Sequence, residues 1–219
     1  MKTLSLAHLV HQPILEEDAP PLLLLLHGVG SNEHDLIALA PFLDKRFLII
    51  SARAPNTLEP GSYAWFDVDF TPQGPIIDPA QAEASRKALI AFLDEAVTAY
   101  GADPKQVYLM GFSQGASVCY ALLSKEPELM MGVAGLAGFL PEPARQWLAP
   151  GRLAGKQVFI AHGTVDETVP VAQARAARDD LARAGAAVAY HEYDGVGHKL
   201  NAQGVRDLTQ WLAARLGAG

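Results

Sequence analysis

The sequence has 219 residues, of which 50% are hydrophobic and 19% are charged, as in an ordinary globular protein of one domain. The net charge of −7 argues against nucleic acid and anionic membrane surfaces as main partners. The only cysteine, Cys119, cannot form a disulfide within the chain. The N-terminus lacks a secretory signal, and no apolar run is long enough to span a bilayer. We therefore expect a single domain over residues 1–219, cytoplasmic and without stable membrane insertion.

In the first part of the chain, apolar runs are separated by polar turns. Residues 3–10 alternate loosely and predict an edge strand, whereas Leu22–Leu26 is apolar on both faces, as a central parallel strand is. A helix should follow, with Ser31 or Asn32 as its cap, and residues 47–51 should form the next buried strand.

Residues 53–80 are expected to form one long loop, because they are rich in proline, glycine and aromatic residues. A loop of this length in a compact domain is usually functional. The alternative is that its aromatic side chains pin the loop to the body of the protein, and the two interpretations are compatible.

Strands then alternate with helices to the end of the chain. Strands are predicted from Val107 and at residues 132–138, 157–162 and 188–193; helices are predicted at residues 81–100, after Ser113, around 145–148, at 170–184 and around Leu208. This alternation predicts an α/β protein with a doubly wound, mostly parallel sheet and helices on both faces.

The segment Gly-Phe-Ser-Gln-Gly at residues 111–115 lies between a predicted strand and a predicted helix. In this context Gly-x-Ser-x-Gly is the pattern of a nucleophile elbow, a strained turn that presents the serine hydroxyl. Gly111 and Gly115 lack the side chains that would collide there. Ser113 is therefore the predicted nucleophile; the alternative is an ordinary strand-to-helix turn of another α/β protein.

Ligands of such sheets bind beyond the carboxyl ends of the strands, so the partners of Ser113 should lie there. Asp166 follows the strand predicted at 157–162, and His198 follows the last predicted strand. Serine, aspartate and histidine in this chain order are typical of the α/β-hydrolase fold. The imidazole would accept the serine proton and the carboxylate would orient the imidazole. Asp194 is the rival carboxylate, since it could orient His198 locally.

Residues next to glycines in three of the turns are expected to have roles beside the triad. Gly28 and Gly30 should allow the N–H of Val29 to point inward, where it would form an oxyanion hole with the N–H of Gln114. The alternative for Gly28 and Gly30 is a tight turn without a catalytic role. His162, which precedes a glycine in the same way as the histidine before Gly28, is expected to make a structural hydrogen bond.

Short segments along nearly the whole chain resemble the phospholipase/carboxylesterase family of small serine hydrolases, which includes acyl-protein thioesterases. They are residues 26–30, 65–67, 111–115, 138–141, 162–170 and 197–198.

The resemblance implies the triad and oxyanion donors named above, and it hints at a homodimer. It also implies that the acyl pocket is formed by Trp65, Phe66, Phe139 and Leu140. The chain departs from the family pattern at Ser31, at Ala116, where a second glycine is usual, and after His198, where it is unlike the thioesterases.

These residues predict a serine carboxylesterase that hydrolyses short- to medium-chain acyl esters, with thioesters and lysophospholipids as further candidate substrates. The reaction needs no cofactor, and the sequence has no metal-binding motif. The alternatives are a non-catalytic ligand-binding protein on the same fold and a serine peptidase or lactonase. Residues 139–155 are too few for a cap domain, so we expect an open, shallow groove walled by the acyl-pocket residues.

Overall fold

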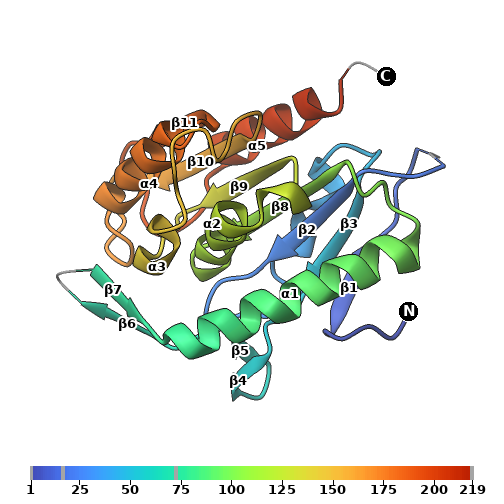
Figure 1. The fold of residues 1–219 in the computed structure, drawn as a ribbon, viewed down its shortest axis with the longest axis horizontal. Coiled ribbons are helices and arrows are strands. Elements are labelled where there is room, and N and C mark those ends of the chain that lie inside the picture. Colours follow the sequence, from blue (N-terminus) through green and yellow to red (C-terminus); the bar gives the residue numbers. More distant parts are fainter. Residues whose placement is uncertain (1, 16–17, 72–73, 218–219) are drawn as a thin grey trace.

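The computed structural model describes residues 2–15, 18–71 and 74–217. A seven-stranded sheet with the order β1-β3-β2-β8-β9-β10-β11 runs through its centre (Figure 1). Only the pairing of β1 with β3 is antiparallel within this sheet. The chain builds the sheet outward in one direction from β2 and then in the other from β8, so the topological switch point lies between β2 and β8, where α/β proteins bind their ligands.

The strands of the sheet are largely buried because helices cover both of its faces. Their bounds are β1 (His8–His11), β2 (Leu22–Leu26), β3 (Leu48–Ala52), β8 (Val107–Phe112), β9 (Gly132–Leu136), β10 (Gln157–Gly163) and β11 (Ala187–Tyr193). All five leucines of β2 are buried, as the unbroken apolar run predicts for a central strand.

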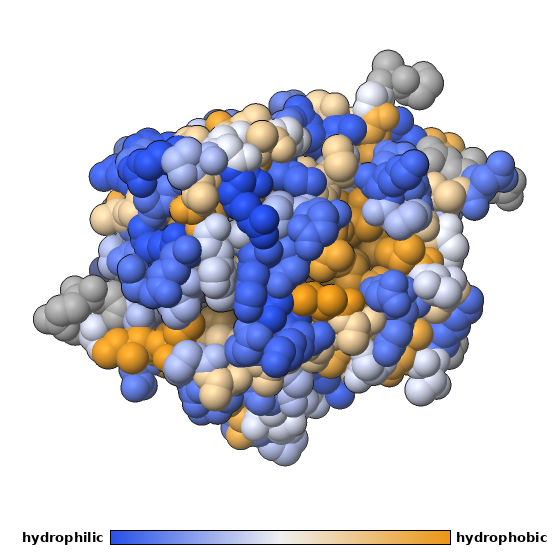
Figure 2. Space-filling model, viewed as in Figure 1, coloured by the Kyte–Doolittle hydropathy of each residue, from blue (hydrophilic) through white to orange (hydrophobic). Residues whose placement is uncertain are grey.

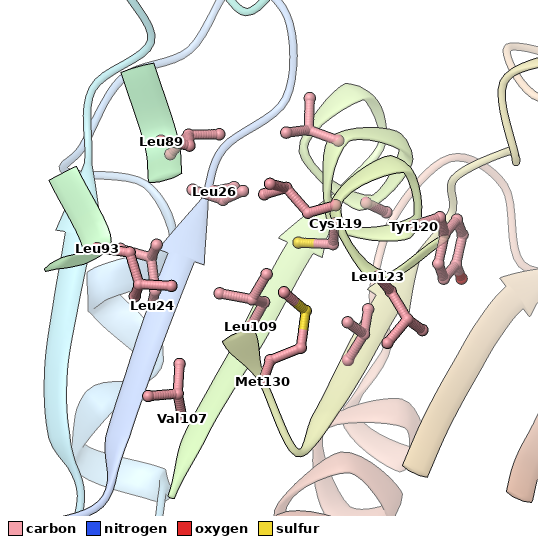
Figure 3. Packing of buried hydrophobic residues seen from close by; sticks show 14 of the residues in the cluster. Leu24, Leu26, Leu89, Leu93, Val107, Leu109, Cys119, Tyr120, Leu123 and Met130 are labelled. Atoms are coloured by element: carbon pink, nitrogen blue, oxygen red, sulfur yellow. The ribbon is translucent and has the colours of Figure 1, made fainter. Parts of the chain in front are cut away.

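Successive side chains of β2 point to opposite faces of the sheet and contribute to two separate hydrophobic clusters. Leu24 and Leu26 join the cluster beneath α1 (Pro79–Tyr100), α2 (Gln114–Lys125) and α4 (Val171–Arg183). Figure 3 shows leucines of α1 beside those of β2, with the buried side chains of α2 over the neighbouring strand.

The other face of the sheet is covered by two further elements. Leu23 and Leu25 pack in the cluster that includes residues of η1 (Leu36–Phe42) and α5 (Ala202–Arg215). The arrangement confirms the α/β fold with helices on both faces of a mostly parallel sheet.

Several local predictions differ from the structure. The edge strand expected at residues 3–10 spans only His8–His11, and the short helix expected around residues 145–148 lies at Glu142–Arg145. The helix expected after Ser31 is the 3-10 helix η1, which contains Pro41, a residue that lacks the N–H needed inside an α-helix. The loop expected at residues 53–80 contains two small hairpins instead. They are formed by β4 (Asn56–Glu59) with β5 (Ser62–Ala64), and by β6 (Val68–Thr71) with β7 (Gly74–Ile77).

The connection between β9 and β10 is short, as the sequence indicates. Among its described residues it forms one helical turn, α3 (Glu142–Arg145), and no cap domain. A further single turn, η2 (Pro127–Leu129), precedes β9. In the described parts of the chain no helix is long and apolar enough to cross a membrane.

Two buried histidines tie loops to the strand ends. His27, which follows β2, accepts a hydrogen bond from the Ala54 N–H at Nε2 (3.0 Å) and donates from Nδ1 to the Gly28 carbonyl (2.8 Å). His162, within β10, donates from Nε2 to the Val169 carbonyl (2.8 Å). Burial lowers the pKa of both histidines from the usual value of 6.5. Both histidines are therefore neutral parts of the folded structure.

The stability of the protein should accordingly fall in mild acid. The folded pKa of His27 and of His162 lies below 6.5, so the unfolded chain binds more protons once the pH falls below that value. The two neutral histidines make their full contribution to the free energy of unfolding above the unfolded pKa. Below it this contribution is lost, by up to about 1.4 kcal/mol per pH unit for each histidine. Urea unfolding between about pH 7.5 and 5.5 measures this slope. His27→Gln should reduce the slope, and an unchanged free energy of unfolding over this range in the wild type would contradict the assignment.

Candidate active site

Ser113 lies in a strained turn between β8 and α2. Its φ of 53° and ψ of −115° place a non-glycine residue at positive φ, which costs about 1–3 kcal/mol and must be imposed by the surroundings. The Ser113 N–H donates to the Leu136 carbonyl of β9 at 2.8 Å. A Cβ on Gly115 would lie 1.9 Å from the Leu26 carbonyl oxygen, and one on Gly111 would lie 2.3 Å from the Gly115 backbone. These glycines therefore allow the contact between α2 and the strands that holds the turn, as the sequence predicts.

The structure brings Ser113, His198 and Asp166 into one hydrogen-bonded chain. His198 Nε2 lies 2.9 Å from Ser113 Oγ, and His198 Nδ1 lies 2.8 Å from Asp166 Oδ2. Since a carboxylate only accepts, Nδ1 carries the hydrogen and Nε2 is the acceptor for the serine hydroxyl. An imidazole held in this tautomer can take a proton from Ser113.

The carboxylate of Asp166 is held by its own loop. Its Oδ1 accepts hydrogen bonds from the N–H groups of Thr168 (2.9 Å) and Val169 (2.8 Å), which leaves Oδ2 for His198. The rival, Asp194, instead accepts a hydrogen bond from Thr164 Oγ1 at 3.1 Å. Of the two candidate carboxylates, the structure therefore places Asp166 against His198.

The loops that carry Asp166 and His198 contact each other closely. A Cβ on Gly163 would lie 2.0 Å from the Val196 carbonyl oxygen, and the Val165 N–H donates to that same oxygen at 3.1 Å. The ring of Phe112 lies against the ring of His198, with centroids 5.0 Å apart. These contacts fix the imidazole, and sequence reasoning did not identify them.

The two backbone donors expected in the oxyanion hole are available. Within the described part of the chain, neither the Val29 N–H nor the Gln114 N–H donates to a protein acceptor. The Val29 loop is held by Gly30, whose φ is 81° and whose N–H donates to the Tyr63 carbonyl at 2.9 Å; the Tyr63 N–H donates in turn to the Ser31 carbonyl at 2.9 Å. The hairpin that begins the segment 53–80 thus supports this loop.

The side chain of Gln114 has a role that the sequence analysis missed. Its Oε1 accepts from the Trp65 N–H at 2.8 Å, and its Nε2 donates to the Phe66 carbonyl at 2.6 Å. Gln114 is buried, and a buried polar side chain must find such partners. The signal was a glutamine at the start of an otherwise apolar or small-residue helix face.

The four residues expected to form the acyl pocket differ in position. Trp65 is completely buried, and its indole N–H donates to the His27 carbonyl at 3.0 Å, so it lies beneath the site rather than on a groove wall. Phe66 is also buried, but it borders both an open groove and a small cavity. Phe139 and Leu140 line a second open groove. In this structure Trp65 therefore does not wall an open groove, because its side chain has no exposed surface.

Two open grooves of about 660 and 700 Å³ lie on either side of the β6–β7 hairpin, and both contact Ile76 and Ile77. The first contains Phe139 and Leu140, which follow β9. The second contains the oxyanion-loop residue Val29 together with three carboxylates, those of Asp67, Asp69 and Asp78. The first groove is therefore lined in part by the residues after β9, and the second by a residue of the loop after β2.

A further apolar groove lies away from this site. Figure 2 shows apolar surface gathered beside α1, where a groove of about 430 Å³ is lined by Ile90, Leu93, Val97 and Val107. Val107 begins β8, whereas Ser113 follows its end, so this groove lies at the opposite end of the strand. Among the described residues, no group of three or more His, Cys, Asp or Glu side chains is arranged to hold a metal ion.

Comparisons with known proteins agree with this architecture. The model of the family described as Phospholipase/Carboxylesterase matches residues 10–216. The crystal structure of the Bacillus cereus carboxylesterase is similar with a TM-score of 0.83 and 31% identity, over 95% of this chain and 94% of that one.

Curated relatives include proteins named as carboxylesterases. The probable carboxylesterase SOBER1-like of Arabidopsis thaliana is 28% identical, over 90% of this chain and 80% of its own length. A protein of Oryza sativa subsp. japonica named as a probable inactive carboxylesterase is 26% identical, over 85% of this chain and 81% of its own. The chain belongs to the Phospholipase/Carboxylesterase family and has the α/β-hydrolase fold of its structural neighbours.

Proposed function

We propose that this protein is a serine carboxylesterase that hydrolyses short- to medium-chain acyl esters through an acyl-serine intermediate. The observation that carries the proposal is the hydrogen-bonded chain from Ser113 Oγ through His198 to the buried carboxylate of Asp166. The backbone N–H groups of Val29 and Gln114, which have no acceptor in the described part of the chain, support the same chemistry.

The proposed reaction has two halves. In the first, Ser113 Oγ attacks the acyl carbon while its proton moves to His198 Nε2, and the negative charge on the substrate oxygen is held by the N–H groups of Val29 and Gln114. His198 then gives this proton to the leaving alcohol oxygen, and the acyl-serine ester remains. In the second half, water loses a proton to Nε2 and attacks the acyl carbon, and the proton returns to Ser113 Oγ as the acid leaves. Asp166 stabilises the imidazolium in both halves.

A non-catalytic ligand-binding protein on the same fold is the main alternative, and one relative is named as inactive. The tautomer and distances of His198 favour catalysis, because a binding protein needs no acceptor aimed at Ser113 Oγ. Thioesters would use the same groups with a thiol as leaving group. A peptidase or lactonase would also use them, and substrate comparison separates these activities from an esterase.

Ser113→Ala should abolish ester hydrolysis while leaving the protein folded. The hydroxyl contributes little packing, whereas loss of a triad serine lowers kcat by about a millionfold in a well-studied serine hydrolase. A chromogenic short-chain acyl ester measures turnover, and urea unfolding measures stability. If the variant kept activity within about tenfold of the wild type, Ser113 would not be the nucleophile.

Asp166→Asn should lower kcat by about ten-thousandfold, because the amide favours the wrong tautomer of His198. Asp194→Asn is the matched control: it removes one charge from the neighbouring loop but leaves the hydrogen bond to His198 Nδ1 intact. Its kcat should stay within a few-fold of wild type. The opposite ranking of the two variants would assign the role to Asp194.

Catalytic efficiency should rise with the first few carbons of the acyl chain and then level off. The groove that contains Phe139 and Leu140 is open, and no cap domain covers it. Each methylene gains about 0.8 kcal/mol, or roughly fourfold, only while it contacts apolar surface. A series of esters from acetate to laurate tests this, and a jump in rate at the solubility limit of the substrate would argue for a lipase instead.

A further inference from the structure

A third buried polar side chain lies against the Ser113–His198–Asp166 chain. Nε2 of His162, in β10, is 3.3 Å from Oδ2 of Asp166, the oxygen that accepts from His198. The side chains of His162 and Asp166 are both completely buried, with exposed fractions of 0%. Water therefore does not screen this contact, and it acts at low effective dielectric.

The hydrogen on His162 can be placed from its partners. Val169 O lies 2.8 Å from Nε2 and can only accept, so Nε2 carries the hydrogen, and the Asp166 carboxylate lies 3.3 Å from the same nitrogen. Nδ1 then has no hydrogen and carries a lone pair, and it has no hydrogen-bond partner within the described part of the chain. The other tautomer would turn a lone pair toward two oxygens, so this neutral form is the one the site accommodates.

His162, Val169 and Asp166 contact one another in a closed set of interactions. Oδ1 of Asp166 accepts from the Val169 N–H at 2.8 Å, and the carbonyl of Val169 accepts from His162. The peptide groups of Val169 therefore link the two side chains, and rotation of the carboxylate away from His198 would break the hydrogen bonds at Oδ1 and bring Oδ2 away from His162 Nε2. Thr168 N–H adds a further bond to Oδ1 at 2.9 Å.

We propose that His162 is a positioning residue of the active site, whose neutral Nε2–H holds the Asp166 carboxylate in the orientation that aligns His198. This inference rests on the proposed esterase function. It goes beyond the triad, because His162 does not contact substrate and acts through Asp166. Its effect should appear in kcat rather than in KM.

The test compares His162→Gln with His162→Met. These side chains have nearly the same length, and only glutamine has an N–H that can reach Val169 O and Asp166 Oδ2. Removing outer partners of this kind from metal ligands typically costs about ten- to a hundredfold. We expect His162→Met to lower kcat by about that factor with KM unchanged, and His162→Gln to restore kcat to within a few-fold of wild type. His162→Leu is a second variant without a donor, should the methionine variant fold poorly.

A double-mutant cycle separates positioning from a general structural role. Because His162 acts through Asp166, His162→Met should have almost no further effect on kcat in an Asp166→Asn background. Equal kcat values for the glutamine and methionine variants, or effects that multiply in the cycle, would overturn the proposal. The activity of Ser113→Ala is measured first. If that variant stayed active, the proposed esterase function would fail. If Ser113→Ala were inactive but His162→Met were fully active, only the role of His162 would be rejected.

Discussion

The close approach of the first turn of α2 to the end of β2 determines where the groups of the active site lie. With no side chain on Gly115, the backbone of α2 can contact the Leu26 carbonyl, and this contact together with the Ser113–Leu136 hydrogen bond holds the serine at positive φ. This conformation costs about 1–3 kcal/mol, and the packing of the five buried leucines of β2 offsets that cost. A fold that stores strain at Ser113 needs a rigid sheet beneath it, and the unbroken apolar strands provide that rigidity.

Gln114 joins the turn to the short connection between β5 and β6. Its side chain pairs with the backbone of both Trp65 and Phe66, while its own N–H has no protein acceptor among the described residues. Trp65 in turn reaches the His27 carbonyl, next to the loop that carries Val29. A displacement of the segment at 65–66 would therefore move both expected oxyanion donors together, which explains why polar atoms are buried here despite their desolvation cost.

The parts of the fold with strong local patterns were predictable, and the parts determined by tertiary contacts were not. The leucine run of β2 and the strand-turn-helix context of Ser113 identified the sheet and the elbow because each has its own periodicity. The hairpins at residues 56–77 lack such a signal: their strands are three or four residues long, and most of the side chains whose burial is described there are half-buried or exposed. Trp65 was assigned to a groove from the family resemblance, and an aromatic residue in a loop has no local feature that distinguishes a substrate wall from a buried anchor.

The choice between Asp166 and Asp194 shows how two similar residues acquire different environments. They follow the adjacent strands β10 and β11, so chain position alone allows either to reach His198. The turn after Asp166 brings two backbone N–H groups back to its Oδ1 and directs Oδ2 to the imidazole, whereas Asp194 accepts from Thr164 on the facing loop. The Gly195 N–H also donates to Thr164 Oγ1, at 3.0 Å, so Asp194 belongs to the contact that holds the two loops together. One carboxylate thus faces the histidine, and the other joins the loops that present it.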